Sequence, residues 1–434
     1  MARFLFTVVP AIGHINPTLP IAVELQRRGH EVAYATGADM QQYIHEQGCA
    51  AFTAGLPSFN NYTSFALRRM FQFQGLLSNF FFFIVLHEYN RRLIADLPDI
   101  IRSFRPDVLV VDCITHSAAH VAEKLRIPWA TNHPVPGLIP SRDAPPFTSW
   151  GLPPAQSLAM RAAYRMVRFG QGIFYRMFDP AFNSIRASQG LPPMRHCVVT
   201  STLSPYLILI PTCEGFEYPR SDWPDQAHLI GPAPWGKGSS KEQSVAWIDE
   251  LPRDRPVIYA TLGTVQVFRS VRFFKTVISA LRHEGYCVVM SIGPVLDPKE
   301  LEPLPYGFRV ERFVPHALIL PRCTAVIHHG GQGIAQDCIY NGLPSVVVPI
   351  SHDLYEIAAR CEHAGVSLKI PYPRLTPERL RTCVKTILAD QAIHAATRSL
   401  QATFRATNAG ETGASLLEQL AATKKPVYRN TQRG

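Results

Sequence analysis

A histidine near the amino terminus has the residue type and the position to do chemistry. His14 lies within Pro10-Ala-Ile-Gly-His-Ile-Asn-Pro17, directly after an apolar run, Phe4–Val9, that we expect to form a strand. Proline is favoured in the first turn of a helix, so a helix is predicted to start near Pro17. His14 then lies at the carboxyl end of a strand, where an imidazole can act as a general base.

A carboxylate that could pair with this imidazole is Asp112, at the C-terminal end of the predicted strand Asp107–Val111. The carboxyl ends of parallel strands meet at one edge of a sheet, so Asp112 and His14 are predicted to be neighbours. A carboxylate bonded to one ring nitrogen fixes the tautomer and stabilises the imidazolium once the other nitrogen has taken a proton. The alternative partner, Asp107, follows Pro106 at the start of the strand and therefore belongs to the opposite edge.

A glycine-rich loop in the last third of the chain is suited to an anion. The predicted strand Ala325–His328 runs into His329-Gly330-Gly331-Gln332-Gly333, and a helix follows. Glycines let the backbone approach a ligand closely, and free N–H groups at a helix start attract phosphate. The loop alone is not specific, because glycines after a strand often only turn the chain.

Two series of alternating strands and helices must position these loops. We expect strands at Phe4–Val9, Glu31–Tyr34, Ala50–Ala54, Asp107–Val111, Ile127–Ala130, Pro256–Leu262, Cys287–Ile292, Arg309–Phe313, Ala325–His328 and Pro344–Pro349. Such repetition indicates the α/β class, with two doubly wound, Rossmann-like parallel-sheet domains facing across a cleft. The Pro/Gly-rich stretch 231–238 reads as the linker between them. We therefore predict domains at residues 1–234 and 235–434, with the last helix free to pack back on the first domain.

Two helical stretches, 62–101 and 156–189, are predicted to be insertions on the first domain. They and the segment between them are rich in aromatic residues: Phe71, Phe73, Phe80, Phe81, Phe82, Phe83, Tyr89, Trp150, Tyr164, Phe169, Phe174 and Tyr175. Periodicity leaves two interpretations open, ordinary helix packing or an apolar wall for a ligand.

Composition and charge narrow the class of partners. The chain has 434 residues, 47% of them hydrophobic, and a formal net charge of +10. Its arginines are scattered and not interleaved with aromatics, which argues against nucleic acid; a nucleotide diphosphate, or peripheral contact with an anionic membrane, suits the charge better. Nine cysteines without a CxxC pair, and no apolar run long enough to span a bilayer, predict a cytoplasmic protein. The loop around His14 has one glycine where a dinucleotide fingerprint needs three, so a nicotinamide cofactor is not expected.

A set of motifs resembles the family-1 glycosyltransferases of the GT-B fold, which include bacterial macrolide, carotenoid and antibiotic glycosyltransferases and plant UDP-sugar enzymes. The resemblance covers essentially the whole chain. It is carried by Gly13-His-Ile-Asn-Pro17, Phe313-Val-Pro-His316, His329-Gly-Gly-Gln-Gly333, Asp337 and the segment from Pro349 to Asp353.

The resemblance implies a role for individual residues. His14 would be the general base and Asp112 its partner, in an acceptor-binding first domain. In a donor-binding second domain, Phe313 and His316 would flank the nucleobase and His329 would contact a phosphate. Asp337 would hold the ribose, Asp353 would touch sugar hydroxyls, and Thr264 would lie beside the diphosphate. The implied donor site comprises Gly13, Thr264, Phe313, Val314, His316, His329, Gly330, Gly331, Gln332, Gly333, Asp337, Asp353 and Leu354.

The sequence departs from the family pattern at four positions in and next to this donor site. Ile334 and Ala335 stand where the family usually offers serine or threonine to the phosphate, and His316 and Leu354 each replace a glutamine. A missing polar group at Leu354 predicts a donor sugar that lacks one hydroxyl or is read differently from glucose.

The predicted function is transfer of a sugar, with inversion, from UDP or dTDP to a hydroxyl of a large apolar acceptor. No Asp-x-Asp pair occurs in the chain, so we expect neither a metal nor any other cofactor. Two alternatives remain: a non-catalytic nucleotide-sugar binder that activates a partner, and a nucleotide-sugar epimerase of the same fold. Release of nucleotide diphosphate that depends on an acceptor would distinguish a transferase from both alternatives.

Overall fold

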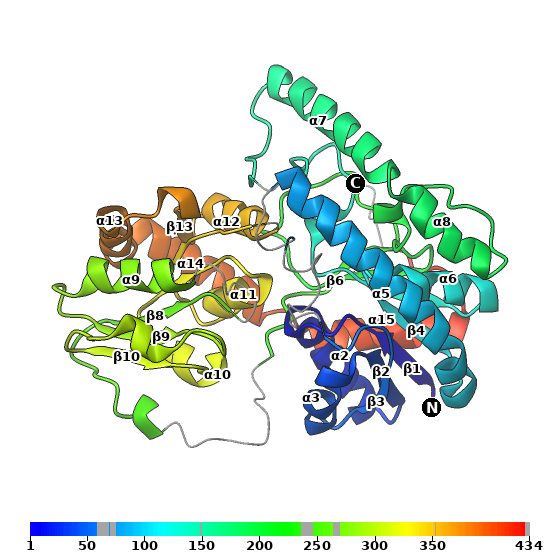
Figure 1. The fold of residues 1–434 in the computed structure, drawn as a ribbon, viewed down its shortest axis with the longest axis horizontal. Coiled ribbons are helices and arrows are strands. Elements are labelled where there is room, and N and C mark those ends of the chain that lie inside the picture. Colours follow the sequence, from blue (N-terminus) through cyan, green and yellow to red (C-terminus); the bar gives the residue numbers. More distant parts are fainter. Residues whose placement is uncertain are drawn as a thin grey trace.

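The computed structural model describes residues 1–58, 69, 75–147, 150–235, 246–263, 270–351 and 353–429. Two parallel sheets lie side by side, each covered by helices (Figure 1). The α/β fold with two parallel-sheet domains, predicted from the alternating runs, is confirmed.

The first sheet has seven strands in the order β3-β2-β1-β4-β5-β6-β7, all parallel. Its strands are β1 (Arg3–Thr7), β2 (Glu31–Thr36), β3 (Ala50–Thr53), β4 (Val108–Asp112), β5 (Trp129–Asn132), β6 (Leu207–Ile210) and β7 (Ala227–Leu229). All five residues of β4 are buried, as expected for an apolar run covered on both faces. The sequence patterns did not predict β6 and β7.

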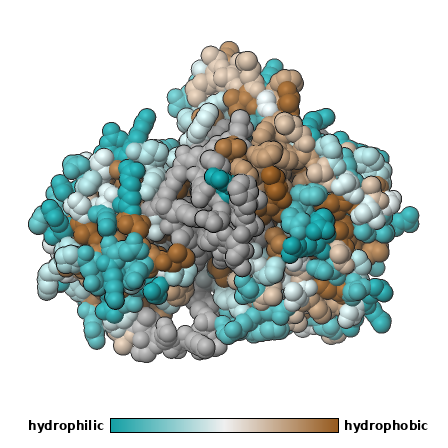
Figure 2. Space-filling model, in the orientation of Figure 1, coloured by the Kyte–Doolittle hydropathy of each residue, from teal (hydrophilic) through white to brown (hydrophobic). Residues whose placement is uncertain are grey.

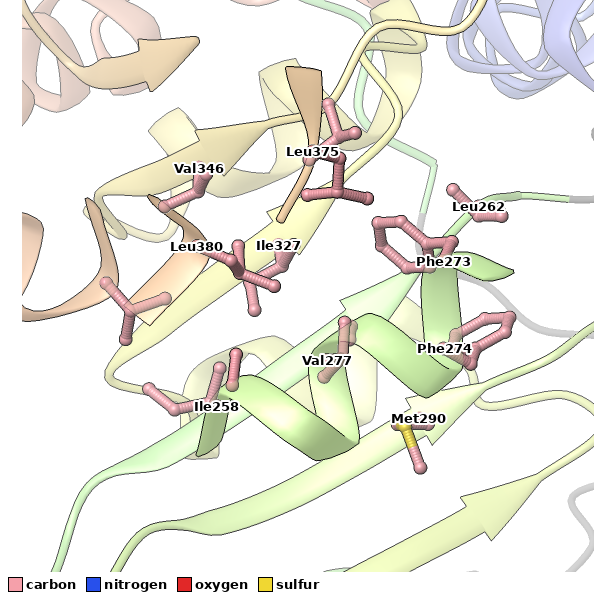
Figure 3. Packing of buried hydrophobic residues seen from close by; sticks show 14 of the residues in the cluster. Ile258, Leu262, Phe273, Phe274, Val277, Met290, Ile327, Val346, Leu375 and Leu380 are labelled. Carbon is pink, nitrogen blue, oxygen red and sulfur yellow. The ribbon is translucent and has the colours of Figure 1, made fainter. Parts of the chain in front are cut away.

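The second sheet has six parallel strands in the order β10-β9-β8-β11-β12-β13. They are β8 (Val257–Thr261), β9 (Cys287–Ser291), β10 (Phe308–Glu311), β11 (Ala325–His328), β12 (Ser345–Val347) and β13 (Ser367–Lys369). Helix α9 (Ser270–Leu281) packs Phe273 and Val277 against Ile258 and Ile327 of this sheet (Figure 3). This packing fixes the carboxyl ends of β8 and β11 in place.

The strand order reverses once in each sheet, and both candidate loops lie at a reversal. In the first sheet it falls between β1 and β4, the strands that precede His14 and end at Asp112. In the second it falls between β8 and β11, and the glycine loop follows β11. Open parallel sheets bind ligands at such switch points, outside the carboxyl ends of the strands.

Helices cover both sheets and extend beyond them. The first domain has α1 (Ile12–Ile15), α2 (Leu19–Arg27), α3 (Gln41–Glu46), α5 (Gly75–Phe104), α6 (His116–Leu125), α7 (Leu158–Arg176) and α8 (Asp179–Ser188). The later helices are α10 (His316–Ile319), α11 (Gln332–Tyr340), α12 (Leu354–His363), α13 (Pro377–Ala389), α14 (Gln391–Arg405) and α15 (Ala409–Thr423). The insertions are thus helical where the structure describes them, and α7 rises away from the sheet (Figure 1).

The last helix, α15, packs against α2 of the first domain. Gly413 lies so close to Ile21 that a Cβ atom would come within 2.8 Å of that side chain, and Arg28 bonds Glu418 at 2.7 Å. Chain ends far apart in sequence therefore share one core, in which Leu417 and Leu420 are fully buried. Among the described helices, none is long and apolar enough to cross a membrane.

Candidate active site

The first switch point brings His14 and Asp112 into a hydrogen bond. Nδ1 of His14 lies 2.7 Å from Oδ2 of Asp112, and the backbone N–H of Ile114 donates to Oδ1 of Asp112 at 3.0 Å. Asp112 is fully buried, whereas about a quarter of the His14 side chain remains accessible. With Nδ1 bonded to the carboxylate, Nε2 of His14 is the nitrogen left for a substrate.

The charges around His14 set its proton affinity. Burial lowers the pKa of His14, but the charge and hydrogen bond of Asp112, helped by the charge of Asp353, outweigh it, so the pKa lies above its ordinary value. Asp353 precedes α12 in the second domain, and burial raises its pKa against the opposing effect of His14. Because each group acts on the other, His14 of the first domain and Asp353 of the second lie near each other.

A third ligand-type atom lies beside this pair. His14, Asp112 and Cys113 each offer one atom that could bind a metal ion, and these three atoms lie within 4.8 Å of one another. Burial and the Asp112 charge raise the pKa of the Cys113 thiol well above its ordinary value, and only a thiolate binds metal well. Within this group, His14 and Asp112 are already hydrogen-bonded to each other at 2.7 Å.

Two polar residues at the end of β5 were not singled out from the sequence. Asn132 pairs in register with Asp112, is fully buried, and has no hydrogen-bond partner for either amide atom among the described residues. His133 follows it, and burial lowers the pKa of His133 to about 4. A buried amide left unpaired beside a base is suited to a substrate hydroxyl. The available signal was the polar run Thr131-Asn132-His133 that ends an apolar strand.

At the second switch point, glycines enclose the His329 ring. A Cβ atom on Gly263 or on Gly331 would come within 2.7 Å of this ring, so neither position has room for a side chain. Burial and the charge of His316 lower the pKa of His329 to about 4, so the ring is neutral at pH 7. Its buried Nδ1 has no hydrogen-bond partner within the described ranges. His329 therefore brings no charge to this loop, and a hydrogen bond to the Thr261 backbone partly opposes the lowering of its pKa.

The neighbouring glycine adopts a conformation that other residues rarely reach. Gly330 has φ +91°, and a Cβ atom there would lie 2.7 Å from the carbonyl oxygen of Leu354. Gly331 then caps α11, and Gln332 and Gly333 begin that helix. Space around Gly333 is open to at least 4 Å, so its position can admit a ligand.

The residues expected around the nucleoside form a pair that was not foreseen. Nδ1 of His316 lies 3.0 Å from Oδ2 of Asp337, and the His316 ring meets the edge of Tyr259. Phe313 is 70% exposed, as a stacking platform must be before a base covers it, whereas Val314 is buried in the core.

The remaining predicted donor residues have diverse positions. The Leu354 side chain is buried in the core of the second domain, so the Leu354 carbonyl, and not the side chain, faces the glycine loop at Gly330. Ile334 and Ala335 also pack in hydrophobic clusters. Gly13 lies in α1, next to His14, with nothing within 4 Å of an added Cβ. Thr264 lies outside the described residues.

The aromatic residues of the insertions pack mostly on one another. Phe83 stacks on Phe178 at 4.3 Å between ring centres and also contacts Phe174 and Tyr175. Tyr89 is fully buried. Ordinary helix packing thus accounts for Phe83, Tyr89, Phe174 and Tyr175 among the predicted aromatic residues. Phe71 and Phe73 lie outside the described residues.

A buried ion pair joins the two domains behind the site. Nε and Nη2 of Arg360, on α12, donate to both carboxylate oxygens of Glu217 at 2.8 and 2.9 Å. The Tyr218 ring lies 4.6 Å from the guanidinium carbon of Arg360, and Arg220 donates a third hydrogen bond to Glu217. Burial alone would raise the pKa of Glu217, but the two arginines hold it below its ordinary value.

Helix α11 is tied to the same part of the first domain. The Gln336 amide donates to the carbonyl of Pro211 at 2.7 Å and accepts from the N–H of Ala233 at 3.3 Å. The helices that follow the glycine loop and Asp353 are therefore both anchored to the segment after β6.

Known proteins resemble this chain over nearly its full length. Residues 283–418 match the family described as the C-terminal domain of erythromycin biosynthesis protein CIII-like proteins. The chain is 30% identical to 4'-demethylrebeccamycin synthase of Lentzea aerocolonigenes over 96% of this chain and 99% of that protein. It is 23% identical to NDP-glycosyltransferase YjiC of Bacillus subtilis (strain 168), over 94% and 95% of the two chains.

A solved structure shares the fold. That of CalG4, the calicheamicin glycosyltransferase, superposes with a TM-score of 0.74 at 19% identity and covers 98% of this chain and 100% of its own. At that identity the similarity concerns the arrangement of the two domains.

Proposed function

The chain belongs to the nucleotide-sugar-dependent glycosyltransferases of the GT-B fold, and from this we propose that it glycosylates a hydroxyl of an apolar small molecule with inversion. The observation that carries the proposal is the 2.7 Å contact between His14 and Asp112 at the first switch point, facing Asp353 of the second domain. A non-catalytic binder would have no use for a positioned base.

In the proposed reaction, Nε2 of His14 takes the proton of the acceptor hydroxyl. The oxygen attacks the anomeric carbon as the bond from that carbon to the diphosphate oxygen breaks, and the diphosphate leaves with the electron pair. Attack from the face opposite the leaving group inverts the configuration. Asp112 keeps the ring in the correct tautomer and stabilises the imidazolium that forms.

On the donor side, we assign the diphosphate to the loop His329–Gly333. Backbone N–H groups at the start of α11 and the neutral His329 ring would stabilise the leaving charge without a metal. Asp353, close enough to influence His14, would accept hydrogen bonds from the sugar, and Phe313 and the His316–Asp337 pair would hold the nucleoside. The unpaired Asn132 is a further candidate for contact with a substrate hydroxyl.

The apolar character of the acceptor is inferred from the helical insertions of the first domain. Tyr89 of α5 donates to the carbonyl of Val8 just after β1, at 3.4 Å, and the charge of Asp112 acts on its phenol. Helix α5 therefore reaches the first switch point, where its apolar side chains are buried in the core of the first domain. The apolar acceptor is inferred from the many aromatic residues that the insertions bring to this domain.

A two-stage experiment tests the proposal. Thermal shifts with UDP, dTDP and GDP identify the nucleotide, because a ligand that binds only the folded chain stabilises it by mass action. The sugars of that nucleotide are then combined with apolar alcohols, nucleotide diphosphate release is measured, and the anomeric configuration of the product is determined by NMR. We expect release that depends on acceptor and an inverted product. Donor binding without transfer to any alcohol would support the binder instead, and a retained configuration would refute the single displacement.

A further inference from the structure

Helix α7 presents a continuous apolar stripe to solvent. The stripe comprises Leu158, Ala162, Met166, Phe169, Ile173 and, just past the helix end, Met177. Their spacing of three and four residues places them on one face. The five large side chains are between 55% and 81% exposed. Soluble domains rarely leave so many large apolar residues together in water without a partner.

The opposite face of α7 is held firmly by the first domain. The Tyr164 hydroxyl donates to the carbonyl of Pro153 at 2.7 Å, and Tyr164 is the one buried residue of the helix. Arg168 and Gln171 donate to the carbonyls of Ala144 and Phe147. Since the helix is already docked on its inner side, the stripe points away from the body. In Figure 2, the projecting region that corresponds to α7 in Figure 1 is coloured mostly in the hydrophobic range.

Positive charge flanks the stripe on one side. Arg161, Arg165 and Arg176 are exposed, and helical geometry places them along one edge of the apolar face. The helix has no acidic residue from Leu158 to Arg176. An apolar face edged by arginines is the pattern of a helix that lies in the interface of an anionic bilayer.

The exposed apolar surface continues onto α5. Phe80 of α5 touches Phe178, next to the end of the stripe, and Leu77 and Ile84 are exposed on the same helix. The two helices therefore offer one connected surface on the domain that carries His14.

We propose that the α7 stripe docks on an anionic lipid surface. Charge decides between this and a second copy of the chain. Two copies joined through α7 would place arginines near arginines, with no carboxylate on either helix to pair with them. Anionic headgroups would neutralise the same three arginines while the acyl region receives Phe169 and its neighbours.

Vesicle sedimentation with the full chain tests this proposal without donor or acceptor, so the result is independent of the proposed transfer. We expect the protein to sediment with vesicles of phosphatidylcholine and phosphatidylglycerol, to stay in solution with phosphatidylcholine alone, and to be released by salt. Reversing charge in Arg161→Glu with Arg165→Glu should lower the partition coefficient at least about fivefold per arginine. The combined variant Met166→Ser, Phe169→Ser and Ile173→Ser should lose most binding.

Matched controls separate the stripe from general stickiness. The variant Val295→Ser with Tyr306→Ser removes exposed apolar side chains from the second domain, 59% and 89% exposed, and should sediment like the wild type. All variants should keep the wild-type melting temperature, because the substituted side chains are exposed. Absence of sedimentation with anionic vesicles, or equal sedimentation of the stripe variant, would overturn the proposal. So would light scattering that shows a dimer in the wild type and a monomer in the stripe variant, since the occupant would then be a second copy.

Discussion

Replacing Asp112 with asparagine alters the base without removing it. In the structure, one oxygen of Asp112 accepts from His14 at 2.7 Å and the other from the backbone of Ile114 at 3.0 Å. Asparagine has nearly the same shape but only one acceptor oxygen. If that oxygen stays with Ile114, the amide NH₂ faces Nδ1 of His14 and the proton moves to Nε2, the nitrogen that must accept from the substrate.

The expected loss follows from that tautomer. A positioned general base contributes roughly 10²–10⁴-fold, so kcat of Asp112→Asn should fall by about that factor, and His14→Ala should resemble it in kind. Asp112 is buried in the first domain behind His14, so the dissociation constant of the nucleotide sugar should stay close to that of the wild type.

The pH dependence gives a readout that a structural defect would not. The pKa of His14 is raised because the effects of Asp112 and Asp353 exceed that of burial. A base must be deprotonated, so wild-type activity should rise with pH through this pKa. Without the carboxylate, burial is opposed only by Asp353, so the acidic limb should move to lower pH while the plateau falls. The raised pKa of His14 also affects the stability of the fold. Protonated His14 stabilises the folded chain at pH values below the ordinary pKa of histidine, and this contribution is lost as the pH rises through the higher pKa of the folded state.

The assay is the initial rate of nucleotide diphosphate release at saturating donor over a pH series. Wild type, Asp112→Asn and His14→Ala are compared, with thermal unfolding as the control for folding. If Asp112→Asn kept wild-type turnover and an unshifted acidic limb, the carboxylate would not orient the base and the proposed mechanism would be wrong.

Four further outcomes are expected. His329→Ala should weaken nucleotide binding by about 1.5–3 kcal/mol in calorimetry, the scale of a hydrogen bond to a charged group, with a smaller effect on the pH profile. Excess EDTA should leave the rate of the purified enzyme unchanged, and loss of activity restored by magnesium would contradict the metal-independent mechanism. Asn132→Ala should slow turnover about 3–10-fold without lowering the melting temperature, because its amide bonds no described residue. Arg360→Met should destabilise the chain by up to about 3–5 kcal/mol in chemical unfolding, because buried Glu217 then loses both hydrogen bonds from Arg360 and keeps the 3.2 Å hydrogen bond from Arg220. The double variant with Glu217→Gln, which removes the charge and keeps an acceptor for Arg220, should recover part of that loss.

The fold could be predicted because its signal is local. Runs such as Val108–Val111 are apolar along their whole length, as strands buried on both faces must be, and helical stretches separate them. The same logic placed His14 and Asp112 at strand ends before their contact was known. Strands β7 and β13 have three residues each, and both mix apolar with polar or charged side chains, so they form no apolar run that could be recognised.

Side-chain direction in the site was beyond the sequence. Leu354 occupies a position where the resemblance places a sugar-reading glutamine, yet its side chain lies in the core. The preference for a deoxysugar donor that we inferred from Leu354 remains a prediction, but the buried Leu354 side chain is not in a position to contact the sugar. Asp337 and His316 were assigned separate roles from the sequence, but their side chains are hydrogen-bonded to each other. The sequence could not show this, because α10 and α11, the helices that carry them, come together only in the folded domain.

The contact that most affects the site is also the least visible in sequence. Glu217 and Arg360 are 143 residues apart, and neither belongs to a motif. Burying such a pair costs solvation that an apolar contact would not, so its advantage must be sought in geometry. Two parallel bonds between guanidinium and carboxylate fix direction as well as distance, whereas apolar side chains would let α12 slide against the first domain. Since Asp353 is the N-cap residue of α12 and acts on His14, a shift of that helix would separate the proposed sugar ligand Asp353 from the proposed base His14. We therefore attribute the relative placement of donor and base to this pair and to Gln336, and the Arg360 variants test that attribution.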